Sequence, residues 1–261
     1  MDANRGMTSV IGPNAAGKST LMKCVTGLLN ANGAMTLGGR DLLGKRDDEL
    51  RKDIAYMPQE PPDRTSLTVM EVMLMGRLDS LKWKVGDEDI DAAYGALEEL
   101  GIEHLATRPM RELSGGQSQI VMIAQCLVRE PKLLIMDEPI NNLDLQKQLE
   151  MFEMLNRVTR NKELTSLLVL HDISFAARFS DQVIVLSDGM VYDSGSPKDV
   201  ITQEMIRDVY GVESDVIIGR DGTPHVHPLY SLRTKKLETL DKDVTVSEDI
   251  DEHAVPEGGI I

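Results

Sequence analysis

A glycine-rich segment near the start of the chain has the residue types and spacing of a phosphate-binding loop, or P-loop. It follows an apolar run and precedes a helical pattern, which is the context that the motif requires. Its glycines let the backbone curl so that successive N–H groups point at phosphate oxygens, and the helix N-terminus adds partial positive charge. Lys18 is expected to reach the phosphates and the Ser19 hydroxyl to bind Mg²⁺. The segment comprises Gly12, Pro13, Asn14, Ala15, Ala16, Gly17, Lys18, Ser19 and Thr20.

Two carboxylates, Asp137 and Glu138, directly follow a run of four apolar residues that predicts a buried strand. The carboxyl end of a parallel strand faces the ligand crevice of an α/β sheet, so these side chains are expected beside the phosphates. Asp137 would hold Mg²⁺, directly or through water. Glu138 would orient and deprotonate the water that attacks the terminal phosphate.

A second segment, Leu113-Ser114-Gly115-Gly116-Gln117, opens a predicted helix that runs to about Arg129. Ser114 is the expected N-cap, and the backbone N–H groups behind it are free to bind an anion. The chain therefore carries two predicted phosphate-binding helix ends.

The elements that must position these residues alternate between strands and helices. Runs rich in Val, Ile and Leu alternate with helical patterns, as a parallel sheet with crossover helices requires. From Pro58 to Leu113 the pattern is helical throughout, which predicts a helical subdomain over residues 60–113 inserted in the α/β core. The Ser187-Asp188-Gly189 segment predicts a hairpin, followed by short helices to about Tyr210 and a last β region to Leu229.

Composition excludes several classes of protein. The 261 residues are 41% hydrophobic and 27% charged, which suffices for a core. No apolar stretch approaches the roughly 18 residues that span a bilayer, and the start lacks a signal-peptide segment, so a membrane role is expected to need a partner. The net charge of −15 argues against nucleic-acid binding. From Glu238 onward there are eight acidic residues and one lysine, which predicts a domain over residues 1–234 and a disordered acidic tail over 235–261.

The motifs, taken in their order along the chain, resemble the ATP-binding cassette (ABC) family. The resemblance runs from about Met7 to Leu229. It implies a P-loop NTPase fold and two subunits that sandwich ATP between the P-loop of one and the LSGGQ signature of the other, residues Ser114 to Gln117. It also implies that Gln59, in Tyr56-Met57-Pro58-Gln59, contacts Mg²⁺ and the attacking water, and that His171 reaches the γ-phosphate. The catalytic residues that the resemblance implies are Glu138, His171 and Gln59. The implied Mg²⁺ ligands are Ser19, Gln59 and Asp137. Asp144, at the end of the D-loop, is expected to lie at the nucleotide.

The sequence departs from the family pattern at Ala15, where many members have Gly, and at the front. Only Met1 to Gly6 precede the first strand, and no aromatic residue that could stack on adenine occurs before Tyr56. A truncated N-terminal antiparallel part is therefore expected. One hypothesis is that the true reading frame starts upstream; the other is a naturally shortened subunit with weakened nucleotide affinity.

Three segments, residues 68–77, 209–212 and 224–229, are similar in sequence to importer subunits that serve iron-siderophore, haem and cobalamin uptake. The resemblance implies transmembrane permease subunits and a second ATP-binding subunit, in a head-to-tail homodimer, as direct partners. A substrate-binding protein would be an indirect partner, and the chain would lie at the cytoplasmic face of the membrane.

One alternative class remains open and two others are disfavoured. The chain could be the ABC ATPase of another transporter class. A chromosome-maintenance or repair ATPase head would need a long coiled coil, for which the residues between Gln59 and the signature are too few. A nucleotide-sensing scaffold without turnover would not need Glu138.

Overall fold

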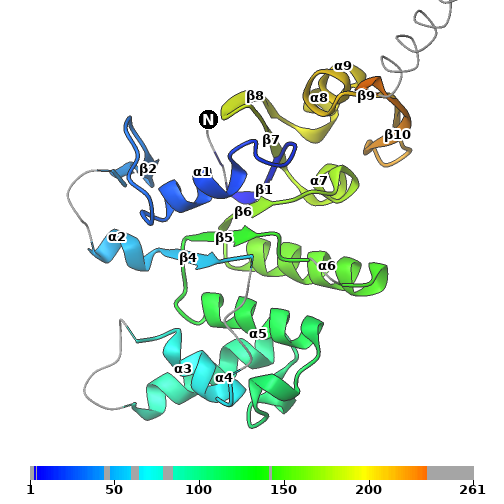
Figure 1. Cartoon of the computed structure of the whole chain (residues 1–261). Helices are drawn as coiled ribbons and strands as arrows, with labels where there is room; N and C mark the ends of the chain where they lie inside the picture. Colours follow the sequence, from blue (N-terminus) through cyan, green and yellow to red (C-terminus); the bar gives the residue numbers. More distant parts are fainter. Residues whose placement is uncertain are drawn as a thin grey trace, which may run out of the picture.

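A computed structural model describes residues 3, 5–43, 48–59, 65–78, 85–140 and 143–233 (Figure 1). The predicted tail over residues 235–261 lies outside the described residues, as does Asn142 of the D-loop. Within the described residues no helix is long and apolar enough to cross a bilayer.

The centre of the molecule is a six-stranded sheet. Its five neighbouring strands run parallel and the last, at one edge, is antiparallel. All five residues of β5 are buried because helices cover both faces, which explains the continuous apolar run in the sequence. The predicted α/β fold with a mainly parallel sheet is confirmed. The strand order is β4 (Ile54–Met57), β5 (Leu133–Asp137), β6 (Thr165–Val169), β1 (Gly6–Ile11), β7 (Gln182–Ser187) and β8 (Met190–Gly195).

Alternate strand residues build two cores, one on each face of the sheet. Val10 and Ile135 pack with Met22 of α1 (Lys18–Val25). Their neighbours along the strands, such as Ile11 and Leu134, belong to the larger core on the other face. That face is covered by α5 (Gly115–Leu127), α6 (Leu145–Asn161) and α7 (Ile173–Phe179). Figure 1 shows α1 on one side of the sheet and α5 and α6 on the other.

Three phenylalanines join α6 to α7. The ring of Phe152 stacks on Phe175 and on Phe179, with centroid separations of 4.9 and 4.8 Å. The side chain of Asp172 caps α7 by accepting hydrogen bonds from the N–H groups of Ser174 and Phe175, at 2.7 and 3.2 Å. This cap fixes the start of α7 at Ile173, two residues after His171.

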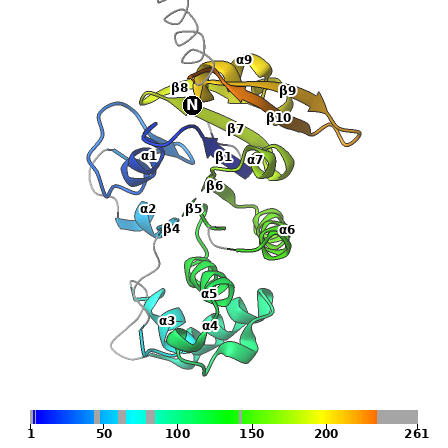
Figure 2. The same ribbon diagram turned by 45° about the vertical axis from the view of Figure 1, so that its right-hand side comes forward.

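Helices and 3₁₀ turns occupy the described residues from Val69 to Glu112, as the helical pattern predicts. The side chains of Thr68 and Glu71 form a capping box that starts the first helix. Figure 2 shows this helical layer at one end of the molecule. The elements are α3 (Val69–Met75), α4 (Asp87–Glu99), η1 (Glu103–Leu105) and η2 (Met110–Glu112).

The opposite end holds the remaining short elements (Figure 2). The predicted hairpin joins β7 to β8, and its turn places Asp188 and Gly189 at φ values of 49° and 76°. Beyond it, a π-helix ends at Tyr210 and leads into an antiparallel hairpin. The elements of this end are α8 (Pro197–Val200), α9 (Gln203–Met205), the π-helix η3 (Ile206–Tyr210), β9 (Val212–Ile218) and β10 (Pro224–Ser231).

Three further short elements lie between α1 and β4 in the chain. They are β2 (Thr36–Leu37), β3 (Arg40–Asp41) and α2 (Asp48–Lys52).

Candidate nucleotide-binding site

The P-loop joins β1 to α1 through backbone conformations that favour glycine. Gly12 and Gly17 have φ values of 147° and 97°, and a Cβ at Gly12 would lie 2.2 Å from the carbonyl oxygen of Leu186. Ala15 also has a left-handed φ, of 64°, although it carries a Cβ. The departure from Gly noted in the sequence therefore falls at a position whose backbone conformation still suits Gly.

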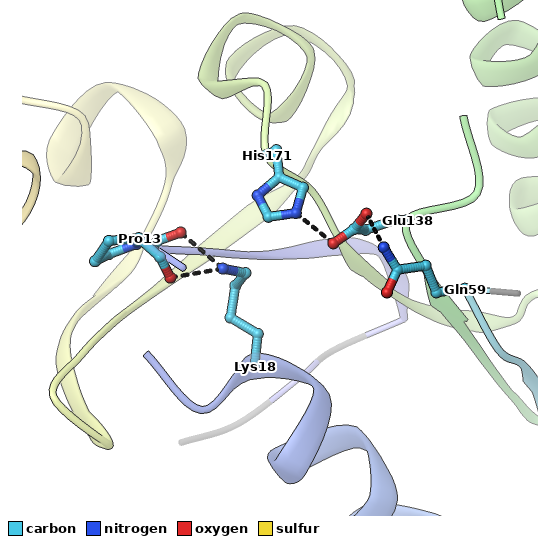
Figure 3. A network of polar contacts seen from close by, with 6 residues as sticks. Pro13, Lys18, Gln59, Glu138 and His171 are labelled. Atoms are coloured by element: carbon cyan, nitrogen blue, oxygen red, sulfur yellow. Dashed lines mark hydrogen bonds and ion pairs between the residues drawn. The ribbon is translucent and has the colours of Figure 1, made fainter. Parts of the chain in front are cut away.

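Lys18, the first residue of α1, points into the loop that precedes it. Its side-chain nitrogen Nζ donates hydrogen bonds of 2.8 Å to the carbonyl oxygens of Gly12 and Pro13 (Figure 3). The residue is 6% exposed. Burial lowers the pKa of Lys18, and the nearby carboxylates of Glu138 and Asp137 partly oppose that shift. The positive charge expected to bind phosphate thus lies inside the loop, held by uncharged carbonyl groups.

Glu138 lies between two other predicted catalytic side chains (Figure 3). Its Oε2 accepts a 2.7 Å hydrogen bond from Nε2 of Gln59, and its Oε1 bonds with Nε2 of His171. The three residues follow the carboxyl ends of β4, β5 and β6, which are neighbours in the sheet. Because parallel strands end at the same edge, residues distant in sequence meet there. Glu138 also has a left-handed φ of 55°, a strained backbone conformation of the kind that functional sites retain.

Asp137 ends β5 and is 3% exposed. Its Oδ1 is buried and has no hydrogen-bond partner among the described residues. A buried carboxylate oxygen without a partner is costly unless a ligand satisfies it. Mg²⁺ prefers hard oxygen ligands, so this atom fits that ion; Ser19, the other expected hydroxyl or carboxylate ligand of the neighbourhood, follows Lys18 on α1. Burial raises the pKa of Tyr56, in the segment that leads to Gln59, and the charge of Asp137 raises it further.

The signature segment forms the capped N-terminus of a second helix, α5. Ser114 caps α5, since its Oγ accepts from the N–H of Gln117 at 3.3 Å and Oε1 of Gln117 accepts from the N–H of Ser114 at 3.1 Å. The predicted N-cap is confirmed. Asp144 caps α6 by accepting a 3.0 Å bond from the N–H of Lys147, and that bond lowers the pKa of Asp144.

A groove of about 400 Å³ adjoins the signature, and Ser114, Gly116 and Gln117 line it together with Leu143 and Lys147 near the start of α6. Its other lining residues are Leu100, Ile120, Glu150, Met151, Met154 and Arg157, so no P-loop residue takes part.

The predicted site residues therefore fall into two groups. Gln59 and His171 each bond with Glu138, and Lys18 lies within electrostatic reach of Asp137 and Glu138. Ser114 to Gln117 and Asp144 belong to the groove side of the molecule. The sequence did not predict the bonds of Lys18 to its own loop or the left-handed backbone of Glu138. Nor did it predict that the charge of Asp137 acts on Tyr56.

Comparisons with known proteins agree with this geometry. The family model described as "ABC transporter" matches residues 2–141. An uncharacterized ABC transporter ATP-binding protein, MJ0089 of Methanocaldococcus jannaschii, is 39% identical over 230 residues, which is 87% of this chain and 89% of that protein. The iron(3+)-hydroxamate import ATP-binding protein FhuC of Bacillus subtilis is 37% identical, covering 81% and 80%. The hemin import ATP-binding protein HmuV of Bordetella avium is 34% identical, covering 81% and 84%.

Solved structures lead to the same family. The ADP conformation of MJ1267, an ATP-binding cassette of an ABC transporter, superposes with a TM-score of 0.71 at 28% identity and covers 79% of this chain and 88% of that one. A dimeric bacterial ABC transporter cassette, MJ0796, gives a TM-score of 0.65 at 27% identity, covering 76% and 88%. The chain belongs to the ABC transporter family and is one of its ATP-binding ATPase subunits.

Proposed function

We propose that this subunit hydrolyses ATP with Glu138 as general base, within a head-to-tail homodimer that drives a metal-chelate importer. The observation that carries the proposal is the position of Glu138. Its side chain is 8% exposed, its carboxylate is held by Gln59 and His171 on either side, and its charge reaches the P-loop lysine. A base needs this combination of fixed orientation and proximity to the phosphates.

In this proposal each side chain has a separate task. Lys18 exchanges its bonds to the loop carbonyls for bonds to phosphate oxygens, since an anion is a stronger partner than a neutral carbonyl. Glu138 turns one oxygen toward the attacking water and accepts its proton. Gln59 keeps the other oxygen in place, and His171 moves from Glu138 toward the γ-phosphate.

Mg²⁺, held by Ser19, Asp137 and Gln59, would neutralise charge on the phosphates. The backbone N–H groups of residues 12–20 would bind the phosphate chain of ATP.

The dimer is inferred from the separation of the two phosphate-binding helix ends. α1 packs on one face of the sheet and α5 on the other (Figure 1), and no described residue of the P-loop lines the groove at the signature. A nucleotide that uses both ends therefore takes its signature, and Asp144, from a second copy. The dimeric relative supports this arrangement.

Mixing two inactive variants tests the sandwich. Lys18→Ala removes the phosphate contact, and Ser114→Asp keeps an N-cap residue but places a negative charge beside the phosphates. Each homodimer then has a defect in both sites, whereas half of the dimers in an equal mixture have one intact site. We expect each variant alone to be silent and the mixture to recover about a quarter of the wild-type rate of phosphate release. A mixture as silent as its components would exclude the sandwich.

The importer assignment rests on the relatives named for ferric hydroxamate and hemin import. We propose that the cargo is an iron-siderophore, haem or cobalamin complex and that the subunit binds a permease at the cytoplasmic face of the membrane. Co-purification with the permease encoded beside the gene tests this, followed by uptake of each chelate into vesicles. Stimulation of ATP hydrolysis by a permease for an unrelated cargo would refute the cargo class.

A further inference from the structure

His171 occupies a single position between two anchored stretches of backbone. On one side, the N–H of Leu170 donates a 3.1 Å hydrogen bond to the carbonyl oxygen of Val10 in β1, which holds the chain directly after β6. On the other side, Asp172 is the N-cap of α7. The side chain of His171 is 44% exposed, so packing alone does not fix it. The direction of the imidazole therefore depends on how firmly its two neighbours are held.

Asp172 is held by its side chain and by its main chain. Its Oδ1 accepts hydrogen bonds from the N–H groups of Ser174 and Phe175, at 2.7 and 3.2 Å. Its carbonyl oxygen accepts a 3.1 Å bond from the N–H of Ala176. The extended backbone that an N-cap requires is present, with φ and ψ values of −84° and 112°. Because the cap fixes these angles, it also fixes the direction in which the chain leaves His171.

The helix that Asp172 caps is itself anchored in the larger core. The rings of Phe175 and Phe179 both stack on Phe152 of α6, and Phe152 is fully buried. A cap can orient its neighbour only if the capped helix is fixed, and this packing supplies that condition.

The group that bonds with the imidazole is anchored to the same strand end. The N–H of Glu138 donates a 3.2 Å bond to the carbonyl oxygen of Val169, the last residue of β6. Oε1 of Glu138 bonds with Nε2 of His171 (Figure 3). The end of β6 thus positions both Glu138 and His171, and the cap holds the chain that follows His171.

We propose that Asp172 is a positioning residue of the hydrolysis reaction, which orients His171 through the cap of α7. The inference rests on the proposed function and adds a residue to it that acts only through His171. Loss of the cap lets the imidazole sample more directions, so fewer of them are productive and kcat falls. The phosphate-binding groups of the P-loop are untouched, so nucleotide affinity stays the same.

Cap-free variants of the full chain test this. Asp172→Ala removes the acceptor, and so does Asp172→Gly, in which the helix start is kept because Gly is well tolerated at an N-cap. We expect either change to lower kcat about ten- to a hundredfold, with KM and the dissociation constant for ATP within about twofold of wild type. Asp172→Asn, which restores an oxygen acceptor, should recover most of the rate.

The matched control is Thr202→Ala, at the start of α9. Thr202 also caps its helix, since its Oγ1 accepts a 3.1 Å bond from the N–H of Met205. This variant should lose stability as Asp172→Ala does, but keep the wild-type kcat. An equal fall of kcat in Thr202→Ala would show a general effect of a lost cap and overturn the positioning role.

A double-mutant cycle with His171→Ala measures whether Asp172 acts through the histidine. If it does, adding Asp172→Ala to His171→Ala lowers kcat by less than about twofold, because the side chain that the cap orients is already gone. A further tenfold loss would overturn the positioning role, as would a wild-type kcat in both cap-free variants, and each result leaves the proposed function intact. A wild-type kcat in His171→Ala would overturn the task proposed for His171 itself, and the positioning role with it.

Discussion

Replacing Glu138 with Gln should abolish ATP turnover while leaving ATP binding intact. The site can accept the amide: its oxygen can still accept from Gln59, and its N–H can donate to Nε2 of His171 in the other tautomer. The fold and the geometry should therefore persist. What is lost is the proton acceptor, which contributes roughly 10²- to 10⁴-fold to such reactions. A thousandfold loss corresponds to about 4 kcal/mol of activation free energy.

Binding should not weaken, because the substitution removes a negative charge that faces the phosphates. Coulomb's law gives repulsion of ~3 kcal/mol at about 5 Å for an effective dielectric constant of about 20, so affinity should be equal or higher. The assay is steady-state phosphate release at saturating ATP, with the dissociation constant measured by equilibrium titration. Glu98→Gln, an exposed residue of α4, is the control for charge. Turnover within about threefold of wild type would refute the base assignment, and loss of binding would show that Glu138 acts in affinity instead.

Three further predictions follow from local geometry. Ser114→Ala and Thr68→Ala each remove a capping box, so each should lower the free energy of unfolding by about 1 kcal/mol in a denaturant titration. Only Ser114→Ala should also lose ATP hydrolysis. Equal hydrolysis in the two variants would contradict the role of the signature. Ala15→Gly removes the strain of a left-handed Ala but makes the unfolded chain more flexible. We expect the free energy of unfolding to rise by about 0.5 kcal/mol. A fall would show that the Ala conformation is unstrained. Burial lowers the pKa of Lys18, so between that lowered pKa and 10.5 the folded state has released a proton that the unfolded state keeps. In this pH window the free energy of unfolding should rise with pH while nucleotide affinity falls. A Lys18→Met variant should show neither trend in melting and binding titrations.

The sequence predicted the sheet and its helices well because both depend on local patterns. Continuous apolar runs in β5 and β6 arise where helices cover both faces, and glycines with left-handed φ values follow from the turns that need them. The order of the strands was not predictable, since it depends on which helix covers which face. β1 lies between β6 and β7, strands that follow it by more than 150 residues in the chain.

Parts of the candidate site were predictable for a similar reason. The carboxyl end of a parallel strand predicted the place of Glu138, whereas Gln59 and His171 were implied by the family resemblance; the structure places both in contact with Glu138. The bonds of Lys18 to the carbonyl oxygens of Gly12 and Pro13 depend on the backbone path of the loop between these residues. No spacing in the sequence carries that information.

The phenylalanine stack between α6 and α7 ties together two helix ends that have different neighbours. Asp144 caps α6 on the groove side, and α7 follows Asp172, the neighbour of His171, whose ring bonds with Glu138. The three rings are all the phenylalanine that the chain contains. Because the three rings pack on one another, the helix capped by Asp144 and the helix that follows His171 share one aromatic contact in the core.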